Sequence, residues 1–351
     1  MSEQVRAALV AVVEGRSLTM DEARAAMGAV MDGEATPAQL AALLVALRMR
    51  GETIEELAGF AGAMRDRVVR VEAPAGTVDT CGTGGDKSGT FNISTCAALV
   101  VAAAGVPVAK HGNRAMTSQS GSADVLEALG VRTDHDAGSA AAALREVGFA
   151  FLFAPMFHPA MKHAGPTRRE IGVRTAFNLL GPLTNPAGAR RQVIGVADPT
   201  AAPRLAEVLR LLGVDRAFVV HGDGLDELPL DGSGVLYHAS PDAVVRHEID
   251  VRELGLPVAQ TSRLAGGDPA TNARLIEAVL GGERGPRRDV VLLNAAAALL
   301  AAGRVEQMES GLELARSTIE DGRARDLLER LRGEKLAADA AKAAEPQGAP
   351  A

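Results

Sequence analysis

The sequence predicts an α/β fold: a small all-helical domain plus a large α/β domain with a central, mainly parallel sheet flanked by helices. Residues 1–72 carry helix signals alone, whereas from residue 73 short β-like runs alternate with Ala- and Leu-rich helical runs. The length of 351 residues, with 47% hydrophobic and 23% charged residues, suits two domains with an apolar core. We place the α/β domain at 73–336 and a disordered Ala-, Pro- and Lys-rich tail at 337–351.

The helical domain is predicted from three capping boxes in quick succession. The paired residues are Thr19 with Glu22, Thr36 with Gln39, and Thr53 with Glu56. Pro37 stands at a first helical position, and Gly51 follows the same helix as a C-cap. That helix gathers its leucines on one face, at Leu40, Leu43, Leu44 and Leu47. A domain this small and apolar must pack on something, so we expect it to contact both the next domain and a second copy of itself.

The α/β domain is predicted from alternating strand and helix signals. The β-like runs are 76–80, 107–109, 149–153, 192–197 and 216–221, and the helical runs between them are 93–104, 122–129, 137–146 and 200–212. The Gly- and Pro-rich stretch 181–190 is a long connection and a candidate hinge. From about residue 269 the chain turns helical again.

Composition excludes several classes of partner. The net charge is −7 with acids and bases interspersed, so we expect neither nucleic acid nor a membrane as a partner. No apolar run reaches the roughly 18 residues that span a bilayer, and aromatic residues make up only 3%. With two cysteines and an N-terminus unlike a signal peptide, the chain is expected in the cytoplasm with reduced thiols. We interpret Cys81 as a small packing residue and not as a nucleophile.

The stretch 79–92 (DTCGTGGDKSGTFN) follows a β-like run and precedes a helix. Gly82, Gly84, Gly85 and Gly89 allow positive φ and close approach to a ligand. A strand, a glycine-rich loop and a helix N-terminus in this order form a cradle for an anion. Taken alone, the stretch fits a flexible surface turn equally well.

A second stretch, 110–128, also follows a strand and opens a helix. Lys110 and Arg114 supply positive charge, and hydroxyl and amide groups come from Asn113, Thr117, Ser118, Ser120 and Ser122. Phosphate oxygens need such donors and charge neutralisation. The alternative is a Ser-rich solvated loop.

Two further stretches carry charge. His158 and His163 are five residues apart with no third ligand near, which does not fit zinc, whereas Arg168 with Arg169 suits a substrate carboxylate or a solvated face. After the run 216–221 come the carboxylates Asp223, Asp226 and Glu227. Carboxylates at a strand's C-terminal end suit Mg²⁺ beside phosphates. Acid–base catalysis and a solvated turn are the alternatives.

Together these stretches resemble the anthranilate phosphoribosyltransferase family of tryptophan biosynthesis. The resemblance covers roughly residues 5–335. Its motifs are GTGGD at 82–86, FNIST at 91–95, KHGNR at 110–114, SGSADVLEALG at 120–130, RTAFNLLGPLTNPA at 174–187 and DGLDEL at 223–228. It implies a helical domain with a hinge contribution from about 156–187, an active site in the cleft between the domains, and a homodimer joined through the helical domain.

The resemblance also implies the reaction, in which the amine of anthranilate attacks C1 of 5-phosphoribosyl 1-diphosphate and pyrophosphate leaves. Catalysis would be electrostatic, with Lys110 neutralising phosphate. The residues implied for phosphoribosyl diphosphate are Gly82, Thr83, Gly84, Gly85, Asp86, Thr90, Asn92, Ser94, Thr95, Lys110 and Ser122. Those implied for anthranilate are Gly82, Asn113, His158 and Arg168, and those for Mg²⁺ are Ser94, Asp226 and Glu227. The chain departs from the family pattern at Gln119 and at residues 87–88, without losing a group that the mechanism needs.

Two alternatives remain open on the sequence. A pyrimidine nucleoside phosphorylase has the same fold and uses inorganic phosphate, which leaves the carboxylate pair and Arg168 without a purpose. A paralogue that binds nucleic acid without transferase activity requires a basic groove, and this chain is acidic.

Overall fold

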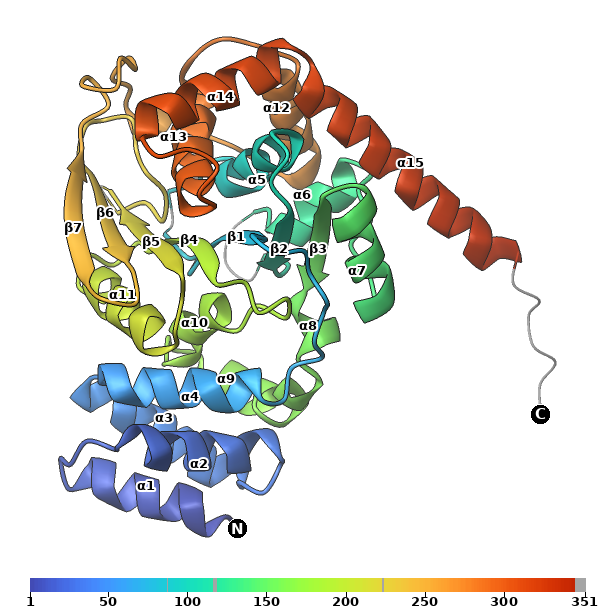
Figure 1. The fold of residues 1–351 in the computed structure, drawn as a ribbon. Helices are drawn as coiled ribbons and strands as arrows, with labels where there is room; N and C mark the ends of the chain where they lie inside the picture. The colour runs from blue at the N-terminus through green and yellow to red at the C-terminus, as the bar shows by residue number, and fades with distance from the viewer. Residues whose placement is uncertain (87, 116–118, 223, 345–351) are drawn as a thin grey trace.

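The computed structural model describes residues 1–86, 88–115, 119–222 and 224–344. Its first four helices form the helical domain (Figure 1): α1 (Glu3–Val13), α2 (Met20–Met31), α3 (Pro37–Arg50) and α4 (Ile54–Arg65). All three predicted capping boxes are present at the starts of α2, α3 and α4, and Gly51 ends α3 with a φ of 89°. The four leucines of α3 are buried, as their spacing predicts.

The second domain is built on a seven-stranded sheet in the order β3-β2-β1-β4-β5-β6-β7. The strands are β1 (Val78–Gly82), β2 (Val108–Gly112), β3 (Phe149–Phe153), β4 (Arg191–Gly195), β5 (Arg216–His221), β6 (Gly234–Ala239) and β7 (Val244–Ile249). The first five strands are parallel, and β6 and β7 are antiparallel. The predicted fold class is confirmed, and the five predicted β-like runs correspond to β1–β5.

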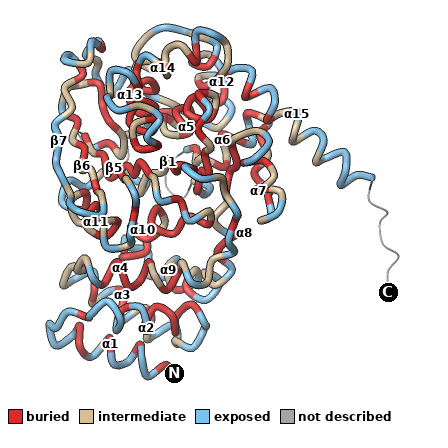
Figure 2. The backbone as a smooth tube through the Cα atoms, viewed as in Figure 1, coloured by how far each residue is buried: buried red, intermediate tan, exposed pale blue. Residues whose placement is uncertain are grey.

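Helices cover both faces of this sheet (Figure 1). The longer helices are α5 (Ile93–Ala103), α7 (Ala137–Glu146), α11 (Ala201–Leu211), α12 (Pro269–Leu280), α13 (Pro286–Ala301), α14 (Met308–Glu320) and α15 (Arg323–Ala344). The shorter ones are α6 (Ser122–Ala128), α8 (Ala154–Phe157), α9 (Gly165–Ile171), α10 (Phe177–Leu180) and the 3₁₀ turns η1 (Pro159–His163), η2 (Gly181–Leu183) and η3 (Thr261–Leu264). The core between these layers is buried, whereas the far end of α15 is exposed (Figure 2).

Alternating side chains divide each strand between two cores. In β5, Phe218 and Val220 join the core under α5 and α13, while Ala217 and Val219 join the core on the side of α11. This second core is continuous with the helical domain and includes Phe177 of α10. The helical domain is therefore packed directly against one face of the α/β domain. Within the described part of the chain, no helix is both long and apolar enough to cross a membrane.

The structure corrects two expectations at the C-terminal side of the chain. The strands β6 and β7 were not predicted. The strand β7 is a polar, largely exposed edge strand that lacks an apolar alternation. The predicted disordered tail is wrong for 337–344, where α15 continues to Ala344. Alanine favours helix there, and Lys335 pairs with Asp339 one turn later at 2.6 Å. Residues 345–351 lie outside the described residues.

Candidate functional site

The glycine loop leaves the C-terminal end of β1 beside the loop that follows β5. Gly82 ends β1 and pairs with Gly195 at the end of β4. A Cβ at Gly82 would lie 2.3 Å from Asp226 Oδ2, and one at Gly195 would lie 1.6 Å from the Asp226 carbonyl oxygen. Glycine at both positions is therefore what allows the acidic loop to sit directly on the ends of the two central strands.

The acidic pair binds backbone N–H groups from both halves of the predicted cradle. Gly84 N donates to Asp226 Oδ2 at 2.9 Å, and Ser94 N in the first turn of α5 donates to Glu227 Oε1 at 3.0 Å. Burial raises the pKa of Asp226 to about 6, and the charge of Asp86 adds to the effect. Burial and the charge of Asp226 together raise the pKa of Glu227 to about 8. Crowded carboxylates of this kind are stabilised by a cation.

The protein supplies only some of the oxygen ligands that Mg²⁺ would need at this carboxylate pair. Within the described ranges, no group of three or more His, Cys, Asp or Glu side chains is arranged to hold a metal ion. Mg²⁺ is usually held by one or two carboxylates together with substrate phosphates and water. The pair therefore fits a metal that arrives with a phosphorylated substrate. Asp223, the third predicted carboxylate of this loop, lies outside the described residues.

Lys110 lies buried within the sheet, against β1, and not at the surface of the site. Its side chain is buried on β2, and Nζ donates to the carbonyl oxygen of Thr80. The fully buried carboxylate of Asp79 lies close enough for its charge to act on the ammonium group, as does that of Glu227. Burial lowers the pKa of Lys110, against these charges. Lys110 thus brings its amine close to the carboxylates of Asp79, Asp226 and Glu227.

Asn92 links the two predicted phosphate loops. As the residue before α5 it makes no side-chain cap; its Nδ2 instead donates to the Ser120 carbonyl oxygen at 3.1 Å. Its Oδ1 accepts from Ser120 Oγ at 3.2 Å and from Asn272 Nδ2 at 2.9 Å. Thr95 is buried one turn into α5. The two loops are therefore held in register through one amide.

The second loop closes on itself at Ser122. A Cβ at Gly112 would lie 2.2 Å from Ser122 Oγ, which donates to the Asn113 carbonyl oxygen at 3.3 Å. Arg114, expected to face phosphate, instead pairs with Asp124 at 3.0 Å and Glu127 at 2.6 Å. Its charge is thus engaged by α6. Thr117 and Ser118 of this loop lie outside the described residues.

The residues predicted to bind the acceptor substrate, anthranilate, lie at the end of β2 and in the segment around α9. His158 Nε2 lies 3.2 Å from His111 Nε2, and both rings are buried. Burial lowers the pKa of His158 to about 4, and burial with the charge of His158 lowers that of His111 to about 3. The guanidinium carbon of Arg168 lies 4.6 Å from the ring centroid of Phe177. Burial lowers the pKa of Arg168, and among the described residues no carboxylate counteracts this effect.

Three more predicted residues, Thr83, Asp86 and Thr90, belong to the first loop, and Gln119 belongs to the second. Thr83 N donates to the Gly195 carbonyl oxygen at 2.9 Å. Asp86 Oδ2 accepts from Ser88 Oγ, which also lies 3.1 Å from Thr90 Oγ1. Gln119 is exposed. The side chains of Asp86, Ser88 and Thr90 are thus linked to one another within the first loop.

Three residues in this region were not predicted. His111 pairs with His158, and Asn272 reaches Asn92 from α12. Arg174 donates to two carbonyl oxygens of the glycine loop. His111 and Arg174 lie within motifs that carry the resemblance, so their position was a usable signal. Asn272 stands alone in α12, and no pattern near it indicates a site.

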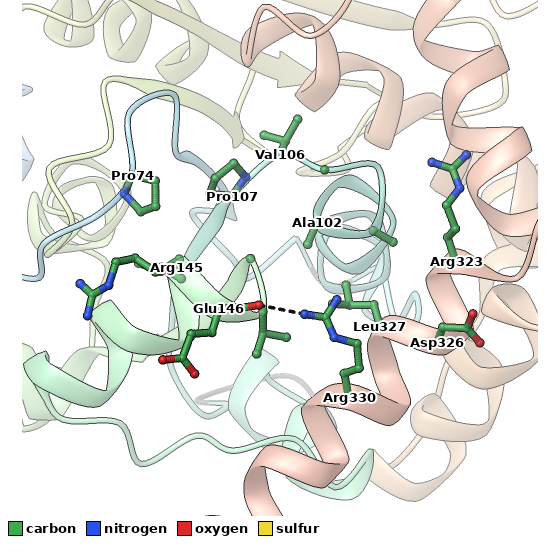
Figure 3. Close-up of a pocket in the computed structure, with 15 residues that line it drawn as sticks. Pro74, Ala102, Val106, Pro107, Arg145, Glu146, Arg323, Asp326, Leu327 and Arg330 are labelled. Carbon is green, nitrogen blue, oxygen red and sulfur yellow. Dashed lines mark hydrogen bonds between the residues drawn. The ribbon is translucent and has the colours of Figure 1, made fainter.

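A cavity of about 560 Å³ lies at the opposite edge of the sheet (Figure 3). Pro107, just before β2, lines it with Arg145 of α7 and Arg330 of α15, and Arg330 Nη2 donates to the Glu146 carbonyl oxygen at 2.9 Å. None of the predicted site residues lines this cavity. Ligands of open α/β sheets bind at the carboxyl ends of the strands. The candidate site is therefore at the end of the sheet that carries the glycine loop, and not at this cavity.

Comparison with known proteins gives matches over nearly the whole chain. A family model described as "Glycosyl transferase family, a/b domain" matches residues 75–325, and one described as "Glycosyl transferase family, helical bundle domain" matches residues 6–68. The anthranilate phosphoribosyltransferase of Xanthobacter autotrophicus is 52% identical over 334 residues, which are 94% of this chain and 97% of that relative.

Solved structures agree with this match. The crystal structure of anthranilate phosphoribosyltransferase from Thermus thermophilus is 46% identical with a TM-score of 0.89, covering 93% of this chain and 99% of its own. That from Saccharomyces cerevisiae in complex with PRPP and Mg is 27% identical with a TM-score of 0.87, covering 96% and 99%. The fold and these matches together show that the chain belongs to the anthranilate phosphoribosyltransferase family.

Proposed function

We propose that this protein transfers the phosphoribosyl group of 5-phosphoribosyl 1-diphosphate to the amine of anthranilate, giving N-(5-phosphoribosyl)anthranilate and pyrophosphate. The observation that carries the proposal is the meeting of Asp226 and Glu227 with the backbone N–H groups of Gly84 and Ser94. A diphosphate and its metal ion need this combination of anion donors and carboxylates. This is the second step from chorismate in the biosynthesis of tryptophan.

The donor half of the site would act on the leaving group. We propose that Asp226, Glu227 and Ser94 hold Mg²⁺, the metal named with the yeast relative's PRPP complex. When bound, Mg²⁺ would neutralise the charge that develops on pyrophosphate. The glycine loop, from Gly82 to Asp86, and the first turn of α5 would bind the diphosphate through those of their backbone N–H groups that no protein acceptor engages. Lys110 would add its charge from within the sheet.

The acceptor half of the site would position a nucleophile that is already neutral. An aromatic amine is weakly basic, so anthranilate needs no strong general base at neutral pH. The lowered pKa values keep His158 and His111 uncharged there, which suits a wall of the binding site and not a proton carrier. Arg168 would bind the anthranilate carboxylate bidentately, with Asn113 and His158 beside the ring.

We also propose that the segment of about 156–187 belongs with the helical domain and closes on the sheet. Ala164, Phe177 and Leu183 are buried in the core that the segment shares with α1–α4. In addition, Arg65 Nε of α4 donates to the Leu183 carbonyl oxygen at 2.6 Å. Closure of the segment would exclude water from the reactive sugar.

We propose, finally, a homodimer joined through α1 and α3. These two helices pack together and expose Val10, Val13, Val45 and Met49, whose exposed fractions are 49%, 70%, 38% and 83%. Neighbouring apolar side chains exposed on a small helical domain are typical of a protein–protein interface.

The experiment that tests the function is the loss of anthranilate fluorescence with phosphoribosyl diphosphate and Mg²⁺, repeated with EDTA. The chain has no Trp, so the protein contributes little background. We expect decay that requires the metal. Folded protein that consumes thymidine and phosphate but not anthranilate would instead identify a nucleoside phosphorylase.

A further inference from the structure

The segment between α9 and α10 contacts the glycine loop through one guanidinium group. Arg174 Nη2 donates to the Gly84 carbonyl oxygen at 3.1 Å, and Nη1 donates to the Gly85 carbonyl oxygen at 3.2 Å. Both glycines have positive φ, at 67° and 72°. A Cβ at Gly85 would lie 2.7 Å from Nη1. Only glycine permits this backbone conformation and this close contact together.

Peptide geometry turns these two contacts into a constraint on two donors. In a planar trans peptide the N–H points opposite to the C=O of the same unit. The Gly84 carbonyl shares its unit with the Gly85 N–H, and the Gly85 carbonyl shares its unit with the Asp86 N–H. By holding both carbonyls, Arg174 directs two consecutive N–H groups to the other side of the loop. Within the described part of the chain, neither N–H donates to another group.

The acidic pair, Asp226 and Glu227, also holds the glycine loop. Gly84 N donates to Asp226 Oδ2 at 2.9 Å, so Gly84 is fixed through both its N–H and its C=O. A charged donor at a carbonyl oxygen also polarises the peptide unit and strengthens its N–H as a donor. The arrangement is a preorganised pair of donors, as an anion cradle requires.

The backbone that carries Arg174 is itself anchored. Gly172 ends α9 in the left-handed conformation, and Thr175 N donates to Asn178 Oδ1 at 3.0 Å. Phe177 is buried and lies under the Arg168 guanidinium. One short segment thus carries both the arginine proposed for the anthranilate carboxylate and the arginine that holds the glycine loop.

We infer that Arg174 is a positioning residue for the donor substrate: it orients the Gly85 and Asp86 N–H groups toward the diphosphate of 5-phosphoribosyl 1-diphosphate. The inference rests on the proposed function and deepens it, because it names a residue outside the predicted site that prepares the loop. It also links the acceptor segment to the donor loop within one stretch of chain.

The test compares Arg174→Met and Arg174→Lys with the wild type, and with Arg169→Met as a control on the exposed face of α9. Calorimetric titration with phosphoribosyl diphosphate and Mg²⁺, without anthranilate, measures donor binding directly. We expect Arg174→Met to weaken this binding about ten-fold or more, as loss of a charge-assisted hydrogen bond does. The KM for anthranilate should change by less than about two-fold, and thermal unfolding should be unchanged because the side chain is exposed. Arg174→Lys, which cannot donate bidentately, should fall between.

A double-mutant cycle separates orientation from simple charge. Gly85→Ala introduces backbone strain in any background, but it collides with a guanidinium only when Arg174 is present. Its effect on donor binding should therefore be non-additive with Arg174→Met. Additive effects, unchanged binding in Arg174→Met, or full binding in Arg174→Lys would each overturn the inference. A wild type that consumes no anthranilate, yet shows these binding differences, would instead overturn the proposed function alone.

Discussion

At the scale of single residues, Arg168 is available to bind a carboxylate: its guanidinium lies over the Phe177 ring, and no acid among the described residues acts on its charge. We expect Arg168→Ala to raise the KM for anthranilate about thirty-fold, since loss of a charged hydrogen-bonded partner costs about 2 kcal/mol or more. Binding of phosphoribosyl diphosphate should change little. Steady-state kinetics with each substrate varied in turn measures this, and Arg169→Ala serves as the control. An equal loss for both substrates would contradict the assignment.

Gly195 shows how closely the acidic loop sits on the sheet. A methyl group there would overlap the Asp226 carbonyl oxygen, so Gly195→Ala must displace the loop that carries the carboxylate pair. We expect a loss of about 1–3 kcal/mol in stability, typical of overpacking, together with weaker metal-dependent substrate binding. Thermal unfolding and titration measure the two effects. Gly333→Ala, in an open helical position, is the matched control and should lower neither.

The sequence motifs indicate which residues gather at the candidate site more reliably than they indicate where a charged side chain points. Asp226, Glu227 and Ser94 come together as their motifs indicate. Arg114 does not face the loop, because Asp124 and Glu127 lie within reach on α6. Whether a charge points to a ligand or to a neighbouring acid depends on tertiary packing, which one sequence does not reveal.

At the scale of elements, α15 is fastened to the body near a buried histidine. His135 is 2% exposed, lies 3.7 Å from Glu334 of α15, and has a pKa lowered by burial to about 4. In the unfolded chain the pKa of this histidine is about 6.5. As the pH falls, the unfolded state therefore binds the proton at a higher pH than the folded state does. The stability from this site is full above pH 6.5 and is lost as the pH falls toward 4.

We therefore expect the midpoint of urea unfolding to drop between pH 7 and pH 4.5, with a contribution from His135 of up to about 3 kcal/mol. His135→Gln removes the titrating group and should flatten the dependence. His247→Gln, on the exposed strand β7, is the control and should leave the dependence as in the wild type. A wild-type slope in His135→Gln would show that other groups govern the acid sensitivity.

The elements that were predicted correctly are those with local signals. The capping boxes at Thr19, Thr36 and Thr53 each start a helix, because their side chains satisfy the first N–H groups wherever the helix lies. The strand β7 is defined only by its pairing with β6, so its polar composition hid it. The end of α15 is helical through its helix propensity and ion pairs, although its composition predicted disorder.

At the scale of the whole molecule, the exposed apolar side chains of α1 and α3 predict self-association. Met49→Glu combined with Val13→Glu should convert a dimer to a monomer, because both protomers would then bury unpaired carboxylates in the interface. Sedimentation velocity measures the change. Leu336→Glu, at a 71% exposed position on α15, is the control and should leave the oligomeric state unchanged. A wild type that sediments as a monomer would contradict the proposed dimer.

The order of the strands also has a consequence for synthesis on the ribosome. The central strand β1 pairs on one side with β4, which follows about 110 residues later in the chain. At a translation rate of about 5–20 residues per second, one edge of β1 waits between roughly 6 and 20 seconds for its neighbour. The four N-terminal helices, whose contacts with one another are local, emerge first and can begin to pack in that interval. The nascent chain thus presents four packed helices joined to a strand whose edge is unpaired until β4 is made.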